Sequence, residues 1–152
     1  MRTLIATVIL MLAVLSCGGT SGSGGRFIPN PGGYPALLGT FTFTFEAGSD
    51  PAGVMGRVLE DPYVLHLHLT SSNDDISAYD DFGRVWDGGF TDTDGTFALS
   101  TDDEFQHERM EISVTGTVDE NGGSGTFSLT LLEGFGDDNG AVVTGVWEAE
   151  IV

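Results

Sequence analysis

The stretch that decides the fold is Thr40-Phe-Thr-Phe-Thr-Phe45. Polar and apolar side chains alternate along it without a break, which is the period of a β-strand with one face in a core and the other in solvent. The three phenylalanines therefore share one face, and the three threonines share the opposite face. The segment predicts a half-buried strand.

The same alternation continues through the rest of the chain and predicts seven more strands. The clearest patterns cover Val64–Leu69, Arg109–Val118, Thr126–Leu131 and Val142–Val152. Weaker patterns predict strands over Gly53–Glu60, Gly83–Thr91 and Thr96–Ser100. Residues that accept the backbone angles of tight hairpin turns separate the strands at Asn73–Asp75, Asp94-Gly95, Asn121-Gly122 and Asn139-Gly140. No segment between residues 36 and 152 has helical spacing over three turns.

About eight antiparallel strands within residues 36–152 predict an all-β fold made of a single small domain. An up-and-down barrel suits this number of strands, and its outline is similar to that of the lipocalins. A β-sandwich is the alternative. A closed barrel also has no exposed strand edge, which matters in a chain that has no lysine to protect one.

The N-terminus has the layout of a secretory signal. Arg2 supplies one positive charge, and Leu4–Leu15 is an apolar stretch of twelve residues. This stretch is too short to span a bilayer, which takes about 20 apolar residues. Residues 18–25 contain only glycine, serine and threonine, the composition of a flexible linker. A tether is therefore expected between the signal and the domain.

Val14-Leu15-Ser16-Cys17 resembles the lipobox of bacterial lipoproteins. The resemblance implies that Cys17 is the lipid attachment site, that residues 1–16 are a cleaved signal peptide, and that residues 17–35 are a lipidated tether. It agrees with the composition, because Cys17 is the only cysteine and has no partner for an internal disulfide. Gly18 after the cysteine implies the outer membrane of the bacterial cell envelope. The membrane is then a partner, reached through the lipid.

Charge excludes one class of partner. The chain has 23 acidic residues against five arginines, a formal net charge of −18. Such a surface repels phosphate backbones, so we expect no nucleic-acid binding. Three explanations of the acidity are open: adaptation to a salty medium, weak calcium binding at turns, or a cationic partner.

Two groups of residues are candidate metal ligands. His66 and His68 lie two apart on a predicted strand and so share its outward face, where they could bind a transition metal with His107 or Glu108 as a third ligand. Solvated polar positions are the simpler interpretation.

Asp92 and Asp94 resemble part of a calcium loop, but the flanking strands and the absence of the closing glutamate favour an ordinary hairpin turn. We therefore predict no cofactor, with calcium as the alternative at acidic turns, including Asp137-Asp-Asn139.

The segment from Ile76 to Phe90 is the least regular part of the predicted domain. It carries Tyr79, Phe82, Arg84 and Trp86, and aromatic and arginine side chains gather at recognition surfaces. The alternative is that these rings fill the core. If the domain binds a protein or a glycan through a loop, this segment is the expected place.

Sequence motifs of common enzymes are absent. The chain has no nucleophile elbow, no His-Glu-x-x-His motif and no phosphate-binding glycine loop. The sequence therefore favours a non-enzymatic envelope protein with a binding or structural role. The alternatives are a carrier that holds a small hydrophobic ligand inside the barrel and, third, an enzyme built on the barrel.

Overall fold

The structure is a computed structural model that describes residues 30, 32–102, 104–105 and 107–152. The signal peptide and nearly all of the tether expected from the sequence, Cys17 included, lie outside these residues. The strands are β1 Leu38–Ser49, β2 Tyr63–Ser72, β3 Asp75–Asp80, β4 Val85–Phe90, β5 Thr96–Thr101, β6 Glu104–Phe105, β7 Glu108–Asp119, β8 Gly122–Glu133 and β9 Val142–Ile151. One 3-10 helix, η1 (Gly136–Asp138), precedes β9. Within the described part of the chain, no helix has the length and hydrophobicity to cross a bilayer.

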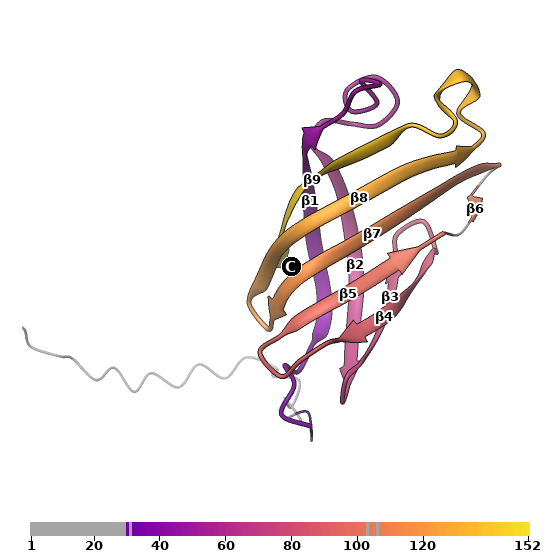
Figure 1. The fold of residues 1–152 in the computed structure, drawn as a ribbon. Helices are drawn as coiled ribbons and strands as arrows, with labels where there is room; N and C mark the ends of the chain where they lie inside the picture. The colour runs from indigo at the N-terminus through magenta and orange to yellow at the C-terminus, as the bar shows by residue number, and fades with distance from the viewer. Residues whose placement is uncertain (1–29, 31, 103, 106) are drawn as a thin grey trace, which may run out of the picture.

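Eight of these strands form a closed antiparallel barrel (Figure 1). From β1 to β5 and from β7 to β9, each strand pairs with the next along the chain; β5 pairs with β7, and β9 pairs back onto β1. The two-residue β6 pairs only with the start of β7. The predicted all-β, single-domain, up-and-down barrel is confirmed, and the sandwich alternative is wrong. The chain closes because every strand from β1 to β9, apart from β6, finds a neighbour on both sides.

The predicted number of strands is right, but one of the predicted strands is wrong. Residues 53–60 form a loop, because the Asp50 carboxylate accepts the backbone N–H groups of Val54 and Met55, both at 2.8 Å, and turns the chain there. The eighth strand is β3, which the sequence analysis left as irregular. Its third inward position is Asp80, a charge where the alternation calls for an apolar residue.

The barrel has two different ends (Figure 1). At the end that we call the hairpin end lie the β2–β3, β4–β5 and β7–β8 turns, together with the start of β1 and the end of β9. The opposite end, the loop end, carries loop 50–62, turn 81–84, connection 102–107 and loop 134–141. Segments distant in the sequence therefore meet at each end.

Aromatic rings occupy the middle of the barrel. The Trp147 ring lies 5.0 Å from that of Phe43 and 5.5 Å, edge-on, from that of Phe97. Phe45 packs in the same way against Phe127 at 5.1 Å. The Trp147 indole N–H is donated to the backbone carbonyls of two neighbouring strands, β7 and β8, at 3.1 and 3.0 Å. The inward residues thus form one packed core.

Two facing glycines allow close packing beside the Trp147 indole. Gly116 of β7 pairs with Gly125 of β8. A Cβ on Gly116 would lie 2.7 Å from Trp147 Cζ2, and a Cβ on Gly125 would lie 2.0 Å from the carbonyl oxygen of Thr115. Any side chain at either position would therefore collide with the core or with the neighbouring strand.

Buried residues cover both ends of the barrel. At the hairpin end, Leu37 is buried in front of β1 and the Tyr34 ring stacks on that of Phe90 at 5.8 Å. At the loop end, Val54 of loop 50–62 is buried in the same core cluster. Phe135 of loop 134–141 packs against that cluster. The core therefore runs from one mouth of the barrel to the other.

We predict that Gly125→Ala destabilises the barrel by about 1–3 kcal/mol, because the added methyl group collides with the backbone of β7. Urea unfolding measures the change. Gly48→Ala is the matched control: its Cβ would meet only ordinary contacts, the nearest at 3.6 Å from Gly145 Cα. Equal losses of stability in the two variants would contradict the steric argument.

Candidate functional site

The described ion pair with the deepest burial holds the turn between β3 and β4. Asp80 and Arg84 are joined at 2.7 Å, with their side chains 0% and 3% exposed. Asp80 Oδ1 accepts the backbone N–H groups of Phe82 and Arg84, both at 3.0 Å. Asp80 Oδ2, the oxygen paired with Arg84, also accepts the Trp86 indole N–H at 3.1 Å. Four donors therefore surround one carboxylate, and this fixes the turn.

Two further polar side chains lie near this pair. Arg84 donates to the Tyr63 hydroxyl at 3.4 Å. Burial raises the pKa of Tyr63, and the hydrogen bond from Arg84 offsets part of that rise. Thr101 is buried with no hydrogen-bond partner for its hydroxyl among the described residues. The β4–β5 register, extended by one pair, places Thr101 opposite Trp86. The Asp80 carboxylate of this cluster is already hydrogen-bonded to four donors, which gives it a structural part in the turn.

The binding residues expected between Ile76 and Phe90 divide into two sets. Arg84 and Trp86 are buried in the network just described. Tyr79 is exposed on the outer face of β3, and Phe82 is exposed in turn 81–84, where its ring centroid lies 5.1 Å from Arg84 Cζ. The structure therefore does not bring the four side chains to one surface. Sequence reasoning missed the central residue of the buried set, Asp80, whose signal was its inward position two and four residues after the apolar Ala78 and Ile76.

The two candidate histidines lie on the outward face of β2, as the alternation predicts. The Nδ1 atoms of His68 and His66 are hydrogen-bonded to the hydroxyls of Thr40 at 2.8 Å and Thr42 at 3.1 Å, directly across on β1. His68 Nε2 lies 3.3 Å from Asp81. Among the described residues no three histidines, cysteines or carboxylates come close enough to hold a metal ion. His107 lies in the tight turn between β6 and β7, apart from this pair.

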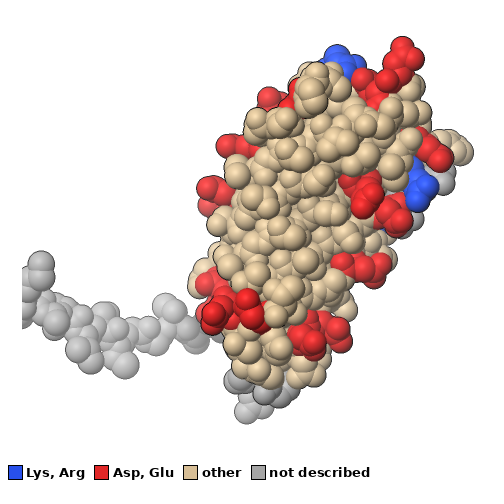
Figure 2. Space-filling view, in the orientation of Figure 1, with Lys and Arg blue, Asp and Glu red and all other residues tan. Residues whose placement is uncertain are grey.

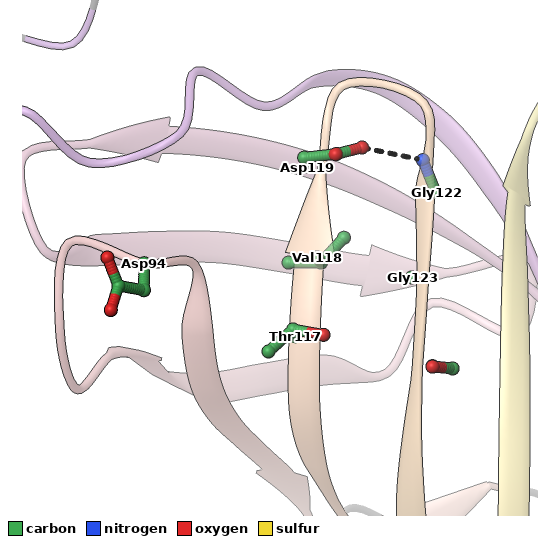
Figure 3. Close-up of a pocket in the computed structure, with 7 residues that line it drawn as sticks. Asp94, Thr117, Val118, Asp119, Gly122 and Gly123 are labelled. Carbon is green, nitrogen blue, oxygen red and sulfur yellow. Dashed lines mark hydrogen bonds between the residues drawn. The ribbon is translucent and has the colours of Figure 1, made fainter.

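The two calcium candidates, Asp92 and Asp94, lie in the β4–β5 hairpin turn. Asp92 accepts the backbone N–H groups of Asp94 and Thr96, which is the hydrogen bonding of a turn. Asp94 borders an open pocket of about 280 Å³ beside the β7–β8 hairpin, where Asp119 accepts the Gly122 N–H at 3.2 Å (Figure 3). This volume is below the range of about 300–1,000 Å³ that is usual for a small-molecule site. Only two carboxylates line the pocket.

The third acidic turn, Asp137-Asp-Asn139, is joined to loop 50–62. Arg57 makes two hydrogen bonds with the Asp138 carboxylate, at 2.6 and 2.8 Å. The hydrogen bond from Arg57 lowers the pKa of Asp138. The pair connects the two largest loops of the loop end and leaves Asp138 already engaged.

Charge is distributed unevenly along the barrel. The three hairpin turns carry six exposed carboxylates, Asp74, Asp75, Asp92, Asp94, Asp119 and Glu120, and none of the described arginines. The described arginines, Arg57, Arg84 and Arg109, lie at the loop end beside a further set of carboxylates, Asp50, Glu60, Asp61, Asp81, Asp102, Asp137 and Asp138, so both ends are acidic. On the face shown in Figure 2, acidic side chains lie mainly around the margin and uncharged ones over the middle of β7 and β8. The outward residues there are serine and threonine, such as Ser113, Thr115, Thr126 and Ser128.

Comparison with known proteins does not identify a family: no family model, no curated protein and no solved structure matches this chain.

We predict that Arg84→Met destabilises the protein by about 3–5 kcal/mol, because it leaves the buried Asp80 carboxylate without its cation. The midpoint of urea unfolding measures the effect. Arg57→Met is the control, since it breaks a pair that is open to solvent. A loss for Arg57→Met as large as that for Arg84→Met would show that burial does not decide the cost.

Tyr63 predicts a loss of stability at high pH. Because its pKa is raised in the folded protein, its contribution to stability is fully present below about pH 10 and is lost as the pH rises above that value. Urea unfolding at pH 9 and pH 11 measures the loss. Tyr63→Phe removes the ionisable group, so the variant is expected to lose less stability over this interval than the parent. An equal loss in both proteins would contradict the assignment.

Proposed function

We propose that this chain is a lipid-anchored protein of the bacterial cell envelope, attached to the outer membrane through Cys17. Its β-barrel serves as a non-enzymatic binding or structural module. The lipobox-like Val14-Leu15-Ser16-Cys17 and the apolar Leu4–Leu15 support the anchor. The modified cysteine of the lipoprotein family carries several acyl chains, which stable anchoring requires.

The observation that carries the choice among the three functions is the packing of the barrel. A carrier needs an interior that side chains leave empty, and ligand-binding barrels keep such a space open at one mouth. Here Phe43 and Phe97 both pack against Trp147 in the middle, and Leu37 and Val54 are buried at the two ends. This arrangement favours a solid scaffold that works through its outer surface.

The polar groups favour the same choice over an enzyme. The buried carboxylate, Asp80, is held by four donors and has a structural part in the β3–β4 turn. The histidines of β2 lie on an open strand face, with their Nδ1 atoms bonded to threonines. Catalysis relies on groups that converge on a reacting atom in a pocket, and these groups do not converge.

We predict that Cys17→Ala releases the protein from the membrane fraction and abolishes incorporation of labelled fatty acid. The measurement compares membrane and soluble fractions of cells that express each protein. The melting temperature of the barrel is expected to be unchanged, because the described core lies within residues 37–149. Retention in the membrane together with continued labelling would refute the anchor.

A further inference from the structure

An exposed aromatic ring stands at the centre of the outer face formed by β2, β3 and β4. Tyr79 is 55% exposed on β3. In the strand register it lies between His68 of β2 and Val85 of β4, and Val85 is 59% exposed. We call this surface the Tyr79 face and define it as His68, Tyr79, Asp81, Val85 and Asp87.

The Tyr79 ring is held in place from one side. The His68 imidazole stacks on it with centroids 4.5 Å apart and an interplanar angle of 22°. His68 is itself held at both nitrogens, by Thr40 at 2.8 Å and by Asp81 at 3.3 Å. A ring fixed in this way presents its remaining surface with little loss of conformational entropy on binding.

Two carboxylates flank the ring. Asp81 follows two residues after Tyr79, touches the same imidazole and has a side chain that is 50% exposed. Asp87 follows Val85 by two residues on the same face of β4, which makes it a diagonal neighbour of Tyr79. The buried network of Asp80, Arg84 and Trp86 lies directly beneath and fixes the turn between the two strands.

We propose that the Tyr79 face binds an arginine side chain presented by a protein partner. A guanidinium group stacks on an aromatic ring and makes forked hydrogen bonds to a carboxylate, and this face offers both features side by side. Charge complementarity selects the same partner, because an anionic ligand would be repelled by Asp81, Asp87 and the net charge of −18. The proposal specifies a partner for the binding role inferred above, but it does not depend on the lipid anchor.

The probe is the peptide acetyl-Gly-Arg-Gly-amide, titrated into the isotope-labelled full-length protein in nonionic detergent. Binding is followed by NMR chemical shifts of backbone amides. We expect saturable shifts concentrated at His68, Tyr79 and Val85, with weaker binding as salt is added. Tyr79→Thr, which keeps a strand-forming residue, and Asp87→Asn are each expected to weaken binding about threefold.

Asp94→Asn at the hairpin end is the matched control, since it removes the same charge from a distant exposed aspartate. It is expected to leave the affinity unchanged. Shifts spread over both ends of the barrel, or an equal loss of affinity in Asp94→Asn and Asp87→Asn, would show attraction to net charge alone and overturn the proposal. Equal affinity for the lysine counterpart of the peptide would overturn the choice of arginine. Far-UV circular dichroism of each variant confirms that the fold is retained.

Discussion

The contact between the Trp147 indole and the backbone of β7 and β8 organises the barrel. From β9, this one side chain bonds to carbonyls of two strands and meets aromatic rings from two more, β1 and β5. Five of the eight barrel strands therefore converge on one indole. The contact needs a glycine at position 116, because a Cβ there would lie 2.7 Å from the indole. The interior of an eight-stranded barrel is just wide enough for side chains to fill it, and this indole lies among the aromatic rings that do so.

The strands with regular alternation could be predicted from the sequence, because each inward position is apolar. Thr40–Phe45 is the clearest example, and its threonines and phenylalanines lie on the faces expected. The prediction failed where a polar side chain satisfies backbone groups or replaces an apolar one. Asp50 folds residues 53–60 into a loop by binding two N–H groups, and Asp80 occupies an inward position of β3. The spacing of Asp80 from Ile76 and Ala78 marks it as an inward position, but a pattern of hydrophobicity does not show the hydrogen bonds that either aspartate makes.

The candidate binding segment was predictable as a region but not as a surface. Its composition singled out one group of four side chains, Tyr79, Phe82, Arg84 and Trp86. Because alternate residues of a strand face opposite sides, Trp86 points inward and Tyr79 points outward. Arg84 is buried as well, because it pairs with the buried Asp80. The outward neighbours that complete the face, His68 above all, come from another strand. Finding them requires the register between neighbouring strands, which cannot be read from the alternation of a single sequence.

The segment before β1 determines how the molecule stands. Asn30 bonds to Asn73 in both directions, donating to its carbonyl at 2.6 Å and accepting its N–H at 2.7 Å. This clasp fixes the point where the chain leaves the barrel, at the hairpin end. If the protein is anchored at Cys17, thirteen residues of chain connect the lipid to Asn30, a distance of at most roughly 45 Å. The anchor that we propose would therefore join the barrel at its hairpin end. Loops 50–62 and 134–141 lie at the opposite end of the barrel, so with such an anchor they would be the part of the domain farthest from the point of attachment.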